Sequence, residues 1–207
     1  VDTATGSVTA EHVILAANGY LGRLEKRTAA RAMPINNFIV ATEPLGRIAP
    51  EVLPGDIAVA DTRFVVNYWR KSEDGRLLFG GGESYGYRFP DDIAALVRKP
   101  MLSVYPQLRD ARIDYAWGGT LAITRPRMPY FGRPAQGLWS ASGYSGHGVA
   151  LATLAGRILA EAIGGPTRRF DLMAGVPVPA FPGGSRLRTP LLVLAMSWFA
   201  MRDRLGI

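Results

Sequence analysis

Apolar residues along the chain fall into short continuous runs and into runs at helical spacing, and glycine or proline separates them. The first run, VTAEHVILAA at residues 8–17, becomes fully apolar at its end, and Asn18 and Gly19 then break it. Such a run is typical of a buried strand in a parallel sheet covered on both faces. Three further stretches are expected to form strands: residues 36–42, 112–122 and 138–141.

Residues 63–70 and 76–82 are expected to pair as a β-hairpin, because Asp74-Gly75 between them favours a tight turn. A helix is expected over residues 91–105, where an aspartate precedes apolar residues near one helical face. Pro100 lies inside this segment and predicts a kink or two helical pieces.

The clearest helical pattern covers residues 147–163 and ends at a Gly-Gly-Pro sequence. Six apolar or small residues predict its buried stripe: Val149, Ala152, Gly156, Leu159, Ala160 and Ile163. A last helix is expected at residues 190–205. Its apolar core of 12 residues is too short to span a bilayer, although flanking arginines would allow contact with a membrane surface.

Composition narrows the classes of function. The chain has 207 residues, of which 48% are hydrophobic and 20% charged, so a packed core is expected. It has no cysteine, which excludes disulfides and thiolate metal sites and fits a reducing, cytoplasmic location. His12 and His147 are the two histidines, so a multi-histidine metal centre is excluded. The net charge of +7 comes without a dense basic tract or nucleic-acid motif, and no nucleic-acid partner is expected.

The sequence GYSGH at residues 143–147 has three interpretations. It nearly matches the G-x-S-x-G elbow of hydrolases, but their triad needs a histidine well downstream of Ser145, and His147 is only two residues away. A glycine-rich turn at a helix N-terminus can instead be an anion cradle, because its N–H groups are unpaired and the helix dipole adds positive charge. An ordinary strand-to-helix turn explains the residues equally well.

A second glycine cluster, GGGES at residues 80–84, does not have the G-x-G-x-x-G spacing of a dinucleotide site, and no helix is expected directly after it. It is interpreted as the end of a strand where the backbone passes close to another group. Gly118 and Gly119 predict a bulge or a close approach in the strand at residues 112–122.

Residues 142–163 resemble the C-terminal flavin motif of the FAD-dependent oxidoreductases that include D-amino-acid oxidase, sarcosine oxidase and glycine oxidase. HVILAANGY at residues 12–20 resembles the strand that closes the FAD-binding sheet of that family. Within the family, the likeness is greatest to members that oxidise gamma-glutamylputrescine. Four segments carry it: ATEPL at 41–45, DGRLLFGGGE at 74–83, WGGTLAITRPRMPYFGR at 117–133 and the tail from FPGG at 181–184.

The resemblance implies an α+β fold, in which a substrate-domain antiparallel sheet with helices adjoins the C-terminal part of a Rossmann-like FAD-binding domain. It also implies bound FAD, and without cysteine the FAD is expected to be non-covalent. The implied divisions are the last strand of the FAD domain at residues 1–33, the substrate-binding domain at 34–133, a strand and helix of the FAD domain at 134–165, and a tail with a C-terminal helix at 166–207.

By the same resemblance, five residues would line the isoalloxazine ring: Ser145, Gly146, His147, Gly148 and Val149. Four others would lie near the ADP half of FAD: Ala16, Ala17, Asn18 and Gly19. Tyr68 and Arg70 lie on the hairpin strand that faces the substrate in relatives, so they are expected substrate contacts. His147 would tune the flavin or relay protons, or else pack as a structural histidine.

The family removes a hydride from the C–H beside an amine nitrogen, which leaves an imine. In sarcosine oxidase-like members a lysine that meets the substrate carboxylate stands where this chain has Ala150. Arg127 stands near the position where amino-acid oxidases often carry an acidic residue. Both differences favour a small amine, such as a gamma-glutamylputrescine-like compound, over a free α-amino acid.

The chain contains no G-x-G-x-x-G unit, which in the family lies near the N-terminus and holds the pyrophosphate. We therefore expect a C-terminal half of such an enzyme, which binds FAD weakly or not at all alone and needs the N-terminal half or self-association. Two alternatives remain: a non-catalytic assembly module without flavin, whose contact is the tail helix, and a serine hydrolase that uses Ser145.

Overall fold

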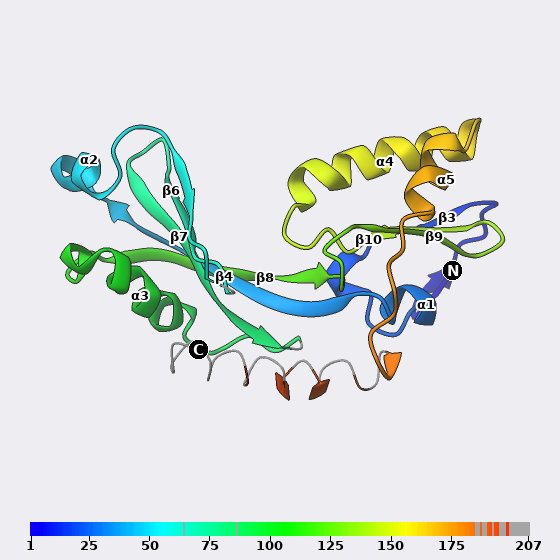
Figure 1. Cartoon of the computed structure of the whole chain (residues 1–207), viewed down its shortest axis with the longest axis horizontal. Helices are drawn as coiled ribbons and strands as arrows, with labels where there is room; N and C mark the ends of the chain where they lie inside the picture. Colours follow the sequence, from blue (N-terminus) through cyan, green and yellow to red (C-terminus); the bar gives the residue numbers. More distant parts are fainter. Residues whose placement is uncertain are drawn as a thin grey trace. The chain divides into compact units, whose positions relative to one another are not determined.

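The computed structural model describes residues 1–63, 65–85 and 87–184, together with residues 187, 190, 191, 193, 194 and 198. The chain divides into two compact units (Figure 1): unit 1 is Val1–Pro34 with Leu121–Ile207, and unit 2 is Ile35–Thr120. The chain passes between the units within strands β4 (Met33–Pro44) and β8 (Ile113–Ile123). Most of the helix expected at residues 190–205 lies outside the described residues.

Unit 1 contains a three-stranded sheet in the order β3-β10-β9. The central strand pairs in parallel with β3 and antiparallel with β9. Its strands are β3 (Val13–Leu15), β9 (Tyr130–Ala135) and β10 (Leu138–Ser142). The other elements of this unit are β1 (Asp2–Thr3), β2 (Gly6–Ser7), η1 (Asn18–Tyr20), α1 (Lys26–Ala29), α4 (Gly148–Gly164) and α5 (Arg168–Ala174).

Helices α4 and α5 cover one face of this sheet (Figure 1). The ring of Trp139 on β10 meets the ring of Phe170 on α5 edge to face, with their centroids 4.9 Å apart. The expected full burial of the first strand is wrong. Although β3 pairs in parallel with β10, Ile14 is 45% exposed, because β3 is an edge strand of this three-stranded sheet.

The extent of α4 confirms the expected helix, but the predicted stripe is largely on the wrong face. The residues that α4 buries against the sheet are Ala155, Ile158, Leu159 and Ala162. Val149, Ala152, Gly156 and Ala160 are exposed. The helix carries small or apolar residues around most of its circumference, so hydrophobic spacing alone does not select one face.

Unit 2 contains a five-stranded sheet in the order β5-β6-β7-β4-β8. The expected hairpin is confirmed as the antiparallel pair β6 (Tyr68–Lys71) and β7 (Arg76–Tyr85), and the backbone φ of +80° at Gly75 makes its turn. The other elements of this unit are η2 (Gly46–Ile48), α2 (Ala49–Val52), β5 (Ala58–Ala60), α3 (Ile93–Val104) and η3 (Pro106–Leu108).

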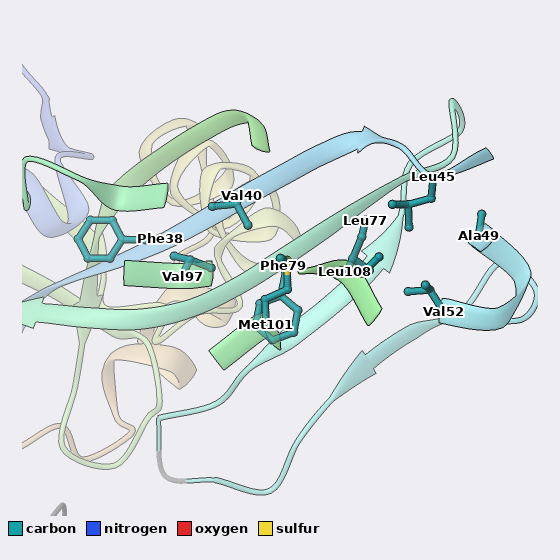
Figure 2. Packing of buried hydrophobic residues seen from close by; sticks show 10 residues of the cluster. All are labelled: Phe38, Val40, Leu45, Ala49, Val52, Leu77, Phe79, Val97, Met101 and Leu108. Carbon is teal, nitrogen blue, oxygen red and sulfur yellow. The ribbon is translucent and has the colours of Figure 1, made fainter. Parts of the chain in front are cut away.

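Helix α3 packs against one face of the five-stranded sheet. Figure 2 shows the buried cluster that joins them, in which Val97 and Met101 of α3 contact side chains such as Phe79 of β7. The Asp92 side chain accepts a hydrogen bond of 2.8 Å from the Ala95 N–H and caps the helix. Pro100 does not divide α3 into two pieces, because the helix is continuous from Ile93 to Val104.

Two glycines confirm that backbone passes close to bulky groups in this sheet. A Cβ on Gly80 would lie 2.2 Å from the Tyr68 ring, and a Cβ on Gly118 would lie 2.4 Å from the ring of buried Phe38. A Cβ on the neighbouring Gly119 would meet no heavy atom within 4 Å. Gly118 therefore has a steric role that Gly119 lacks.

Replacing Gly118 by alanine should lower the free energy of unfolding by about 1–3 kcal/mol, because the methyl group overpacks the core at Phe38. The matched variant Gly119→Ala should leave that free energy unchanged or raise it by up to about 1 kcal/mol, since it only restricts the unfolded chain. Urea unfolding of the two variants compares them directly. Equal losses in both would contradict this account of Gly118.

An ion-pair network fastens the hairpin turn to β8. The guanidinium of Arg76 contacts Asp74 at 2.6 Å and Asp114 at 2.5 Å, and Arg112 contacts Asp114 at 2.6 Å. Hydrogen bonds from Arg112 and Arg76 lower the pKa of Asp114 below its ordinary value of 3.8. The folded state therefore favours the ionised carboxylate.

Because the folded-state pKa of Asp114 is lowered, its contribution to stability is complete above its ordinary pKa and is lost as pH falls through the lowered value. Asp114→Asn should therefore reduce the urea midpoint at neutral pH, and the difference from the wild type should shrink below pH 3.8. The exposed Asp110, changed to asparagine, is the control, because it lies outside the network. A difference that stays constant with pH would refute the assigned role of Asp114.

Candidate functional site

The carboxyl ends of β3 and β10 meet at one edge of the unit 1 sheet. Ser140 of β10 is in register with Leu15 of β3, so the segments that follow the two strands emerge side by side. The Gly143 N–H donates a hydrogen bond of 3.1 Å to Oδ1 of Asn18 and joins those segments. Carboxyl ends of parallel strands are where open α/β sheets bind their ligands.

The turn from Gly143 to His147 holds a strained backbone that its side chains fix in place. Gly143 and Ser145 have φ values of +76° and +52°, in the left-handed region. The Ser145 side chain, 4% exposed, accepts a hydrogen bond of 3.2 Å from the Thr124 N–H and donates one of 3.2 Å to the Gly143 carbonyl. The turn is thereby pinned to the residues that follow β8.

This placement argues against Ser145 as a hydrolase nucleophile. A positive φ is what a strained nucleophile elbow has, but an elbow exposes its hydroxyl. Here the hydroxyl is buried and engaged within the turn. It also cannot line a bound ring through its side chain, so any contribution of Ser145 to ligand binding is made by positioning the turn.

The first turn of α4 presents backbone N–H groups at the surface. His147 is the N-cap residue, and no side chain among the described residues caps the helix. Val149 is 97% exposed, and a Cβ on Gly146 would meet no heavy atom within 4 Å. Unpaired N–H groups and the helix dipole give this terminus a partial positive charge. An anionic edge of a planar ligand fits such a surface.

The four residues expected near the ADP half of FAD lie beside the same turn, at the end of β3. Asn18 has a φ of +43° and begins the short helix η1. Gly19 is buried, Ala17 and Asn18 are half-buried, and Ala16 is exposed. The structure therefore brings both expected cofactor segments together at one sheet edge, and the Asn18–Gly143 hydrogen bond connects them.

Tyr68 and Arg70 line a separate pocket of about 250 Å³ within unit 2. They project from β6 on the sheet face opposite α3, because Trp69 between them packs into the core cluster. The other residues that line this pocket are Ile39, Ala58, Val59, Trp69, Leu78, Gly80 and Trp117. The two expected substrate contacts thus lie together in a largely apolar pocket.

A hydrogen-bond chain holds the Tyr68 ring. Its hydroxyl donates to Oδ1 of Asn37 at 2.5 Å, and the Asn37 amide nitrogen donates to the Gly82 carbonyl at 3.2 Å. Burial raises the pKa of Tyr68, so the phenol stays neutral at physiological pH. The hydrophobic pattern did not indicate a role for Asn37. The one available signal was the polar pair Asn36-Asn37 inside an otherwise apolar strand.

Among the described residues, no group of three or more histidine, aspartate and glutamate side chains could hold a metal ion. In the same part of the chain, no helix is both long and apolar enough to cross a membrane.

Comparison with known proteins identifies the class. Residues 1–162 match the family model described as FAD dependent oxidoreductase, and the chain belongs to this family. The chain is 48% identical over 204 residues to "Probable oxidoreductase OrdL" of Rhizobium meliloti (strain 1021), with 99% of this chain and 47% of that protein covered. It is 43% identical over 209 residues to gamma-glutamylputrescine oxidoreductase of Escherichia coli (strain K12), with 100% of this chain and 49% of that protein covered. The chain therefore spans about half the length of these relatives.

Solved structures support the same fold. Glycine oxidase from Geobacillus kaustophilus matches with a TM-score of 0.62 and 23% identity, over 77% of this chain and 43% of that one. L-proline dehydrogenase from P. horikoshii matches with a TM-score of 0.60 and 23% identity, over 77% of this chain and 44% of that one. The expected α+β fold with a partial FAD-binding domain is confirmed.

Replacing Ser145 by alanine should lower the free energy of unfolding by about 1–3 kcal/mol, because the buried Thr124 N–H loses its acceptor. The control is Thr153→Ala, which removes an exposed hydroxyl that donates a hydrogen bond to the Val149 carbonyl, and it should change stability little. Thermal unfolding measures both. If Ser145→Ala is as stable as the wild type and the wild type reacts with a fluorophosphonate at Ser145, the structural role of the hydroxyl is wrong.

Proposed function

We propose that the chain forms the flavin-edge and substrate-binding parts of an FAD-dependent oxidoreductase that oxidises a small amine. The observation that carries the proposal is the uncapped N-terminus of α4 beside the Asn18–Gly143 hydrogen bond. Family membership supplies the identity of the planar, partly anionic ligand that this edge suits. Unit 1 would then serve the cofactor and unit 2 the substrate.

The proposed cofactor contacts are backbone groups rather than side chains. The N–H groups of Gly146, Gly148 and Val149 would meet the pyrimidine edge of the ring, and the residues after β3 would lie toward the ADP half. His147 is exposed at the N-cap, where its imidazole could exchange a proton with a ligand. No cysteine is present to form a thioether, so the FAD would be held non-covalently.

Bound FAD supplies a two-electron acceptor for the C–H bond beside the amine nitrogen. The α4 terminus would stabilise negative charge that develops on the ring, because its partial charge is fixed in place before the reaction. Tyr68 and Arg70 would orient the substrate from the sheet of unit 2. No general base is required among these residues, since a neutral amine can lose a hydride directly.

We infer a gamma-glutamylputrescine-like amine as the substrate, because a relative with 43% identity acts on gamma-glutamylputrescine by name. Ala150 and Arg127, which differ from the residues expected in family members that act on amino acids, also favour an amine over a free α-amino acid. Exposed apolar side chains at the sheet edge and on α4, such as Ile14 and Leu154, favour a further contribution to the fold from an N-terminal half or another chain. Alone, the chain is expected to bind FAD weakly, and its proposed location is the cytoplasm.

A chimera tests the proposal. This chain would replace the segment that it matches in the Escherichia coli relative, and the purified chimera and the isolated chain would each be incubated with FAD and desalted. The chimera should retain a visible flavin absorbance band, and gamma-glutamylputrescine should bleach that band without oxygen. The isolated chain should retain little or none.

Two variants of the chimera localise the contact. A Cβ on Gly148 would lie 3.7 Å from Tyr144, an ordinary contact, so Gly148→Ala should fold normally and yet weaken flavin binding by obstructing the N–H groups. Gly156→Ala, in open space on the same helix, should leave flavin binding unchanged. A folded chimera without flavin, or with flavin that no amine bleaches, would overturn the proposed function.

A further inference from the structure

The pocket of about 250 Å³ in unit 2 carries a specific set of polar groups in an apolar lining. Its charged side chain is that of Arg70, whose guanidinium donates a hydrogen bond of 3.4 Å to the Lys71 carbonyl and, within the described part of the chain, forms no ion pair with a carboxylate. Ile39, Leu78 and Trp117 form apolar surface around it. An arginine beside an apolar wall selects a planar anion, since its guanidinium can pair with both oxygens of a carboxylate.

The second polar group of the pocket is an acceptor. The Tyr68 proton is committed to Oδ1 of Asn37 at 2.5 Å. The orientation of Asn37 is fixed in turn, because its amide nitrogen donates to the Gly82 carbonyl. The Tyr68 oxygen therefore presents lone pairs to a ligand. Because its own proton is already donated to Asn37, this oxygen suits an N–H donor.

The charge of Arg70 also determines which end of a substrate enters. An end of the substrate that carries a cationic amine and no carboxylate would be repelled by Arg70, so the reacting amine does not belong in this pocket. The volume is below the roughly 300 Å³ at which pockets for whole drug-sized ligands begin. The pocket thus suits one end of an elongated molecule.

We propose that this pocket binds the acyl end of the amine substrate, and that this end is amino-acid-like, with a carboxylate on Arg70 and an N–H donor on the Tyr68 oxygen. The proposal rests on the proposed function and assigns the acyl group of that substrate to this pocket. Arg70 and Tyr68 are specificity-determining residues in this account, and Asn37 is a positioning residue.

Binding to the full chain tests the proposal without flavin or turnover. Three probes lack the reacting amine: gamma-glutamyl-n-butylamide has both polar groups, N-butylglutaramic acid lacks the ammonium, and 4-amino-N-butylbutanamide lacks the carboxylate. Calorimetric titration should show that the first probe binds most tightly. Arg70→Gln should weaken binding of the two carboxylate probes by about tenfold to a hundredfold, and it should leave binding of the third unchanged or strengthen it.

Tyr68→Phe should weaken binding of the two ammonium probes and leave binding of N-butylglutaramic acid unchanged. This second variant tests the proposal even if Arg70→Gln does not fold. Lys71→Gln is the matched control, because Lys71 follows Arg70 on β6 but projects to the opposite sheet face. No binding of the first probe by the wild type, or equal losses for all three probes in Arg70→Gln, would overturn the proposal. Failure of the proposed function would appear separately, as a folded chimera without reducible flavin.

Discussion

The candidate cofactor site of unit 1 depends on the parallel pairing of β3 with β10. These strands lie far apart in the sequence. The hydrogen bond from the Gly143 N–H to Asn18, which is 125 residues away in the sequence, joins the segments that follow them. Without this pairing, the segment after β3 and the turn before α4 would have no common surface. The pairing therefore converts two local turns into one candidate cofactor site.

The turn before α4 combines fixed geometry with open backbone. Ser145 is buried and binds the turn to Thr124, whereas Gly146 and Val149 are exposed and Gly148 is half-buried. This division explains why the motif carries a serine and glycines together. The serine fixes the conformation, and the glycines leave room for a ligand near the N–H groups.

Local sequence signals predicted the hairpin at Asp74-Gly75, helix α3 and helix α4, because turn residues, caps and periodicity act over short distances. They did not indicate β9 or α5, because such short elements show too few periods of a hydrophobic pattern. They also did not indicate the buried face of α4, because apolar and small residues surround most of that helix. The resemblance placed Tyr68 and Arg70 at the substrate side. The positions of Asn37 and Trp117 beside Tyr68 and Arg70 follow from the order of the strands in the sheet. The hydrophobic pattern does not determine that order.

The central claim is that the exposed N–H groups at the start of α4 meet the flavin. A titration of the isotopically labelled chain with excess FAD, followed by amide chemical shifts in NMR spectra, tests it most directly, because weak binding is still detected. The account predicts the largest shift changes at Gly146, Gly148 and Val149, with smaller ones near Asn18. Shift changes elsewhere in the chain that leave these amides unchanged would contradict it.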